Sequence, residues 1–181
     1  MTSAAISAFD HAMQDATDLV QHFDRLNTLP PPVENEVLKR ASLVMALAAL
    51  ETYFEDRIVE AVERITGDIE SDPSRFMRDC LTHDLKTFHT PSADRVRPLF
   101  QKYLGFDITE AWHWNHMEPA GARSELNALA RKRGDIAHRS GRPSGQAGSS
   151  KHAVSRDDLR RHIHFIRQMV LATDEELNRR L

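Results

Sequence analysis

The sequence has few of the features that mark secreted, metal-stabilised or membrane proteins. Among its 181 residues there is one cysteine, Cys80, which excludes a disulfide scaffold and metal sites built from several cysteines. Seven glycines and eight prolines are too few for a collagen-like or low-complexity chain. The longest apolar run, residues 43–50, has eight residues, whereas a membrane-spanning helix needs ~20. The first residues carry no basic region followed by an apolar segment. We therefore expect a cytoplasmic protein that is neither secreted nor inserted in a membrane.

Charge is distributed unevenly along the chain, although the net charge is only −3. Residues 48–72 hold eight acids and two arginines, a net −6. Residues 121–167 hold eleven lysines and arginines against four acids, a net +7. A basic segment of this size attracts a polyanion such as RNA, but charged stripes are also common as solvated helix faces.

Apolar residues recur at helical spacing along most of the chain, and no segment has the alternating pattern of a strand. We predict one all-α domain over residues 1–181, a helical bundle with two long helices, shorter middle helices and a C-terminal helix. The Gly-, Ser- and Pro-rich stretch predicts a flexible loop at about 140–154. The predicted helices are a first one ending at the triproline 30–32, then 34–66, 74–88, 92–104, a short turn at 109–116, 119–138, and a last one beginning after the capping pattern at Ser155.

The second of these helices is apolar on every side over residues 43–50, which predicts that other elements surround it there. Beyond residue 50 its apolar side chains narrow to one stripe, with the acidic residues facing away. The predicted stripe consists of Leu50, Phe54, Ile58, Val62 and Ile65.

The segment 131–141, Arg-Lys-Arg-Gly-Asp-Ile-Ala-His-Arg-Ser-Gly, concentrates the residues that could do chemistry. At 100° per residue, Arg133 falls within the apolar stripe of this helix, so it needs an ion-pair partner or a second chain. The same geometry places His138 about 140° from Arg133. Two explanations remain open. Either the helix loosens near Gly134 and Ser140, or two copies meet and share the site. The small residues Ala130, Gly134 and Ala137 favour the second, because they allow a partner helix to approach closely.

This segment resembles a known motif. Arg133-Gly134-Asp135-Ile136-Ala137-His138 is similar to the Arg-x4–6-His motif of the HEPN superfamily, in the form found in RiboL-PSP-type HEPN domains. The stretch 49–56, Ala-Leu-Glu-Thr-Tyr-Phe-Glu-Asp, is similar to a Leu-Glu-x-aromatic stretch in those proteins, and the order of helices agrees over most of the chain. Four Arg/His pairs in the sequence have the required spacing, and the context selects the pair on the helix that ends before the Gly/Ser loop.

The resemblance implies a HEPN-like bundle, usually dimeric, that is often a metal-independent RNase of toxin–antitoxin or antiviral systems. It implies that Arg133 and His138, from both subunits, line the catalytic cleft. Histidine then transfers protons and arginine neutralises the phosphate, as the 2′-hydroxyl attacks and leaves a 2′,3′-cyclic phosphate. RNA is the expected partner, with an antitoxin protein as a further candidate, and no cofactor or metal is required.

Supporting roles fall to residues around this pair. We expect Asp135, Arg131 and Glu51 to support catalysis, since Asp135 could replace the polar residue that commonly follows the motif arginine, where this chain has Gly134. Arg131 is an alternative working arginine at the x6 spacing, and Glu51 could orient either His138 or Arg133. The residues expected to bind RNA are Lys132, Arg139 and Arg142.

Structural roles are the alternatives for each of these residues. His138 could cap the C-terminus of its helix, where a cation is favourable. Arg133 could form a structural ion pair with Glu51 or Glu55. The whole chain could then be a non-catalytic HEPN-like dimer that binds RNA, a nucleotide or a partner protein. The Trp-His-Trp-Asn-His stretch at 112–116 could stack bases, but we expect packing in the core or at an interface.

Overall fold

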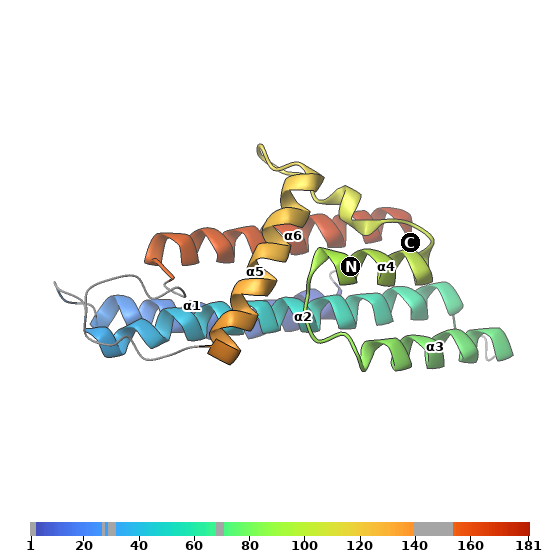
Figure 1. Cartoon of the computed structure of the whole chain (residues 1–181). Helices are drawn as coiled ribbons and strands as arrows, with labels where there is room; N and C mark the ends of the chain where they lie inside the picture. The colour runs from blue at the N-terminus through green and yellow to red at the C-terminus, as the bar shows by residue number, and fades with distance from the viewer. Residues whose placement is uncertain (1–2, 27, 29–31, 68–70, 140–153) are drawn as a thin grey trace.

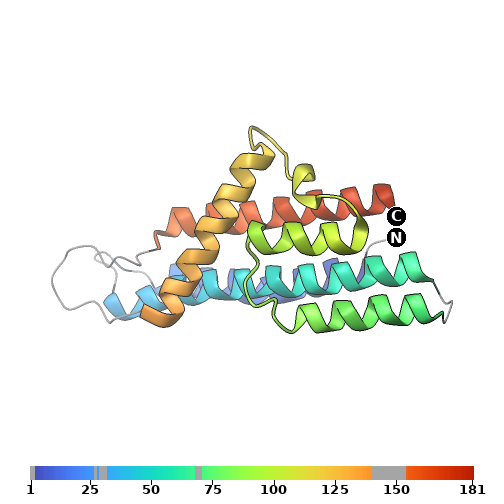
Figure 2. The same cartoon turned by 45° about the vertical axis from the view of Figure 1, so that its right-hand side comes forward.

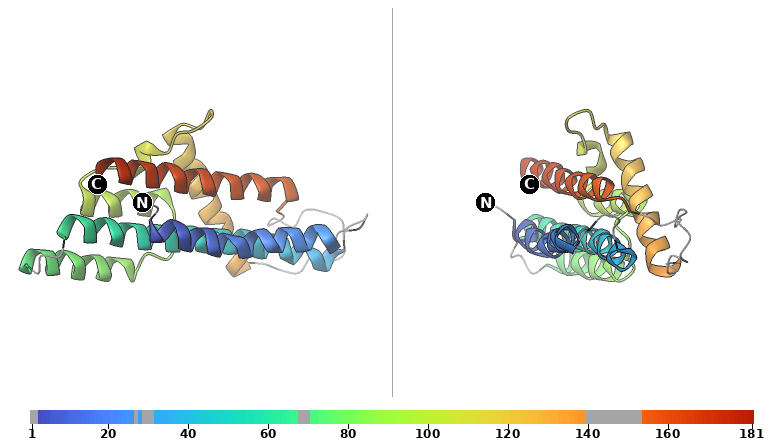
Figure 3. Two further views of the ribbon diagram at one scale, coloured as in Figure 1. Left: turned by 180° about the vertical axis from the view of Figure 1, so that it is seen from behind. Right: turned by 90° about the vertical axis from the view of Figure 1, so that its left-hand side faces the viewer.

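The computed structural model describes residues 3–26, 28, 32–67, 71–139 and 154–181. These residues form an all-α bundle, as predicted, with no strand among them. The long helices α1, α2 and α6 run side by side, and the shorter α3 and α4 lie along the C-terminal half of α2 (Figure 1). Helix α5 crosses the bundle at a steep angle (Figure 2). Seen end-on, it lies across one flank (Figure 3). The helices are α1 Ala4–Leu26, α2 Glu36–Thr66, α3 Asp72–Leu85, α4 Ala93–Leu104, α5 Pro119–Arg139 and α6 Arg156–Arg180, with the 3-10 helices η1 Val33–Asn35 and η2 Ile108–Ala111.

The predicted helix boundaries agree with the structure to within a few residues, and the capping residues explain why. The Ser155 hydroxyl accepts a hydrogen bond from the Asp158 amide at 3.0 Å and starts α6. Gly105 ends α4 with φ 79°, a backbone conformation that favours glycine. Gly67 ends α2 as predicted. The predicted flexible loop at 140–154 lies outside the described residues, except for the buried Val154.

The helical turn predicted over 109–116 is only partly present. Its first residues belong to η2, but beyond Trp112 the chain makes a tight turn, in which Trp114 and Met117 pair and Asn115 and His116 have positive φ. Trp112 is fully buried and donates a hydrogen bond to the Thr173 hydroxyl at 2.9 Å. The Trp114 ring is partly buried and packs against Phe165, so both tryptophans pack, as expected.

The core lies between α1, α2, α4, η2, α5 and α6, and Phe54 is near its centre. The Phe54 ring lies 6.1 Å from that of Phe100 and 6.0 Å from that of Trp112, measured between ring centroids. One face of α2 is left open, because Met45 is 38% exposed. The prediction that other elements surround residues 43–50 was therefore wrong for that face. Ile65 was also wrongly placed in the apolar stripe: it lies in the last turn of α2 and is 49% exposed.

A buried ion pair joins α2 to α6 within this core. Arg57 donates to the Asp174 carboxylate at 2.7 Å and to the Asn178 amide oxygen at 3.0 Å, and the Asn178 amide donates back to Asp174 at 2.7 Å. The side chains of Arg57 and Asp174 are only 4% and 9% exposed. The hydrogen bonds compensate for the desolvation of both charges.

Removing one member of this pair should be costly. We expect Arg57→Met to lower the free energy of unfolding by about 3–5 kcal/mol, because it leaves the Asp174 charge buried without its cation. The measurement is urea unfolding followed by circular dichroism. Arg75→Met is the matched control, since Arg75 pairs with Asp72 on the surface, where a pair contributes at most about 1 kcal/mol. Equal losses in the two variants would contradict this account.

Candidate functional site

Helix α5 carries most of the predicted site residues, and its buried side chains fix which way they point. Leu126, Leu129 and Ile136 are buried against the bundle, as the apolar stripe predicted. Ala137, predicted on the same stripe, is exposed in the last turn of α5. Arg133 lies within the buried stripe and therefore faces α2.

Arg133 is held by two acceptors that come from different parts of the chain. Its Nη1 donates to a Glu51 carboxylate oxygen at 2.8 Å and to the main-chain carbonyl of His89 at 3.0 Å. The Arg133 and Glu51 side chains are 24% and 17% exposed. This is the ion pair considered as the structural alternative for Arg133, with Glu51 and not Glu55 as the partner. The supporting role of Glu51 in catalysis stays a prediction. The Glu51–Arg133 pair joins α2 to α5, and the hydrogen bond to His89 joins α5 to the connection between α3 and α4.

The connection that carries His89, residues 86–92, is anchored at both ends. Phe88 and Pro91 are buried, whereas the His89 side chain between them is exposed. Beyond the connection, the Ala93 amide at the start of α4 donates to the Asn127 side chain of α5 at 2.8 Å. The position of His89 is thus set by the same helix that carries Arg133.

Glu55, one turn after Glu51 on α2, completes this group of charged residues. Burial, together with the neighbouring charges of Glu51 and Asp56, raises the pKa of the Glu55 carboxyl, and the nearby His89 opposes that rise. A carboxylate that is half-buried beside another carboxylate has a reason to attract a cation or a proton. We call Arg133, Glu51, Glu55 and His89 the Arg133 cluster.

His138 lies outside the Arg133 cluster. It is exposed in the last turn of α5, and no hydrogen bond or ion pair joins it to Arg133, Glu51 or any other residue that the structure describes. The helical offset of about 140° between Arg133 and His138 is therefore preserved, and α5 remains helical through Gly134. Of the two explanations for how these residues meet, a loosened helix is wrong over residues 133–139. A site shared between two copies stays a prediction.

The other predicted residues lie on the same helix. Asp135 is half-buried and has an interaction partner, while Arg131 is exposed. Lys132 is half-buried and faces α6, where its charge contributes to lowering the pKa of His162, which burial lowers most. Arg139 ends α5, but the structure does not describe its side chain, and Arg142 lies outside the described residues.

Most of the basic residues of segment 121–167 are neutralised within the chain. Two arginines of α6 pair with the same aspartate of α1, and others pair with acids on α1, α2, η2 and α6 itself. Only Arg131 and Lys132, among the cations of this segment whose side chains the structure describes, form no ion pair. These two unpaired cations both lie on α5. The ion pairs are Arg123–Glu110, Arg133–Glu51, Arg156–Asp24, Arg160–Asp24, Arg161–Asp158 and Arg167–Asp10.

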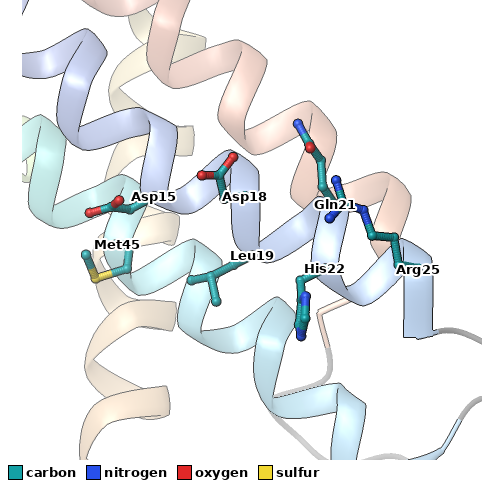
Figure 4. Close-up of a pocket in the computed structure, with 7 residues that line it drawn as sticks. All are labelled: Asp15, Asp18, Leu19, Gln21, His22, Arg25 and Met45. Atoms are coloured by element: carbon teal, nitrogen blue, oxygen red, sulfur yellow. The ribbon is translucent and has the colours of Figure 1, made fainter.

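The predicted site residues do not line the groove between α1 and α2 (Figure 4). This groove has a volume of about 610 Å³. Leu19 and the exposed Met45 form its apolar part, and α1 supplies the polar side chains around them, including His22 and Arg25. The described residues contain no group of three or more His, Cys, Asp or Glu side chains that could hold a metal ion. No helix among them is long and apolar enough to cross a membrane.

Comparison with protein families decides the family. The model of the family described as RiboL-PSP-HEPN matches residues 10–179, nearly the whole chain. The chain belongs to the RiboL-PSP-HEPN family. No curated protein and no solved structure matches it. The HEPN resemblance of segments 49–56 and 131–141 is thereby confirmed, and in this HEPN chain those two segments meet through the Glu51–Arg133 pair.

Sequence reasoning missed one member of the Arg133 cluster. His89 is 44 residues before Arg133, in a connection with no motif of its own, and only the packing of that connection brings it to α5. Nothing in the sequence around His89 indicates this contact.

The raised pKa of Glu55 predicts how the stability of this HEPN domain depends on pH. The folded pKa lies above the unfolded value of about 4.3, so the penalty for burying the charge is absent at pH 4 and present at neutral pH. We therefore expect Glu55→Gln to raise the free energy of unfolding at pH 7 and to leave it unchanged near pH 4. The measurement is urea unfolding at both pH values. Glu63→Gln, at an exposed acid on the same helix, is the control. If Glu55→Gln changed the free energy of unfolding no more than Glu63→Gln at both pH values, the expectation would be contradicted.

Proposed function

We propose that this HEPN protein is a metal-independent endoribonuclease that works as a homodimer. The observation that carries the proposal is the state of the Arg133 guanidinium. Both hydrogen bonds that Arg133 donates within the described residues use Nη1. Its Nε and Nη2 are left to bind phosphate oxygens as a fork, while Glu51 fixes the plane of the group.

The reaction follows from the chemistry of RNA and needs no metal ion. His138 removes the proton of the 2′-hydroxyl, whose oxygen attacks the adjacent phosphorus, and Arg133 neutralises the charge that develops on the phosphate oxygens. The bond to the 5′-oxygen breaks, which gives a 2′,3′-cyclic phosphate and a 5′-hydroxyl. DNA lacks the attacking hydroxyl and stays intact. Asp135 supports the site, and Arg131, Lys132, Arg139 and Arg142 attract the RNA backbone.

A second copy of the chain resolves the separation of Arg133 and His138. A twofold contact that covers the exposed part of the Arg133 side chain would place His138 of the other copy beside it. The Gly134 position fits such a contact, since no atom lies within 4 Å of where its Cβ would be. Ala137 is exposed on the same helix, but Ala130 is only 6% exposed and already packs within its own chain. The expectation that all three small residues face a partner is therefore narrowed to Gly134 and Ala137.

The biological setting we propose is a toxin–antitoxin or antiviral system in the cytoplasm, with the 1–181 chain acting as one domain. An antitoxin protein would then be a partner. The alternative is a non-catalytic HEPN dimer that binds RNA, a nucleotide or a protein. Gly134 favours that alternative, because a polar residue commonly follows the motif arginine in active members of this superfamily.

Cleavage of a single-stranded RNA in EDTA tests the proposal. We expect the wild type to leave 2′,3′-cyclic phosphate ends, and His138→Ala and Arg133→Ala to cut at least about 100-fold more slowly, the usual size of a lost proton-transfer or charge-stabilising group. The chain offers matched controls: Arg78 and His83 have the same spacing on α3. Arg78→Ala and His83→Ala should cut like the wild type. RNA binding without cleavage would support the alternative, and equal cleavage by all variants would indicate a contaminating nuclease.

A further inference from the structure

The groove between α1 and α2 leaves apolar side chains exposed among the residues that the structure describes. Leu19 and Met45 form its apolar part, and Met45 is 38% exposed. Where α1 ends and α2 begins, Leu26 and Val37 are 44% and 51% exposed. Leu26 follows Leu19 by two helical turns, so the two leucines lie on the same face of α1. An exposed apolar surface bordered by polar residues is typical of an interaction site.

The charged residues of the groove are not used within the described part of the chain. Other aspartates of α1 pair with arginines of α6. In contrast, Asp15, His22 and Arg25 are exposed and form no hydrogen bond or ion pair through their side chains to any described residue. Asp18 accepts one hydrogen bond, from Gln14 on the same helix, at 2.7 Å. These side chains can therefore interact with a partner that enters the groove.

The order of these charges makes the groove complementary to itself. The acidic residues come first along α1 and the basic residues follow. Asp15 and Arg25 are each five residues from Val20, and both line the groove. Asp18 and His22 are each two residues from Val20. A second α1, antiparallel to the first about a twofold axis at that level, brings each acidic residue level with a basic residue of the other copy. The resulting pairs are Asp15 with Arg25 and Asp18 with His22.

We propose that the α1–α2 groove docks on the same groove of a second copy of this chain, through an antiparallel contact between the two α1 helices. A twofold contact needs one surface that is complementary to itself, which is what the charge order on α1 provides. Leu19 and Met45 supply the apolar area. The charge pairs set the direction, because a parallel contact would place like charges together. The acids make the groove a poor site for a polyanion such as RNA.

This contact is separate from the one proposed for Arg133 and His138. Helices α1 and α5 lie on opposite sides of α2, as the front and back views show (Figures 1 and 3). A copy docked on α1 therefore leaves α5 free to meet another copy. The α1 contact alone builds a dimer, and the two contacts together build a tetramer. The inference does not depend on the RNase function.

Charge reversal tests the contact at residues that take no part in the proposed catalysis. Asp15→Arg makes both ends of the α1 contact basic, and Arg25→Asp makes both ends acidic, so each variant repels its own copies. We expect each assembly to contain half as many chains as that of the wild type, measured by sedimentation equilibrium. Association through α1 should be at least about 10-fold weaker, since each substitution acts twice across a twofold axis. Glu63→Arg and Arg64→Asp, exposed on α2 outside the groove, are the controls and should assemble like the wild type.

Mixing the two variants shows whether the contact joins two copies. In the mixture, the basic ends of one variant meet the acidic ends of the other, so the wild-type mass should return. A mixture that keeps the mass of the separate variants would overturn the inference. A wild type with the same mass as Asp15→Arg would also overturn it, and the groove would then be left to a different protein. Neither result bears on RNA cleavage, and a wild type that cuts no RNA leaves the α1 contact standing.

Discussion

The ion pair between Glu51 and Arg133 is the contact on which the rest of the site depends. It fastens α5 to α2 and, through the His89 carbonyl, to the connection between α3 and α4. A guanidinium directed into the bundle by the apolar face of α5 would be costly without an acceptor. Glu51 satisfies one nitrogen and sets the plane of the group. The same contact therefore joins α2 to α5 and leaves Nε and Nη2 of the guanidinium for the phosphate that we propose it binds.

The pair of acids on α2, Glu51 and Glu55, lowers the stability of the fold at neutral pH, and the loss comes from Glu55. Glu55 lies half-buried next to Glu51, and its raised pKa shows that its charge is unfavourable there. A residue selected only for stability would be neutral at this position. Two acids on one face of α2, one paired with Arg133 and one beside His89, fit a site in which charges are placed for a ligand or a reaction rather than for folding.

The sequence predicted the helices and the HEPN motif, but it did not predict which residues each side chain contacts. Periodicity and capping residues locate α1 to α6 because these signals are local. The exposure of Ile65 and Met45 depends on which faces of α2 the other helices cover. The contact of the His89 carbonyl with Arg133 depends on packing between segments 44 residues apart. The charge count also misled in part. Most cations of the basic segment whose side chains the structure describes pair with acids from other helices, which no count along the chain reveals.

The central claim is that Arg133 of one copy works with His138 of another, and subunit mixing tests it most directly. Arg133→Ala and His138→Ala proteins, each inactive alone, would be mixed and allowed to exchange subunits. In a mixed dimer, the intact Arg133 of one chain would meet the intact His138 of the other, and one of the two sites would be restored. The account predicts that RNA cleavage returns on mixing, to about a quarter of the wild-type rate if subunits pair at random. A mixture that exchanges subunits and remains inactive, while the wild type cuts, would contradict it.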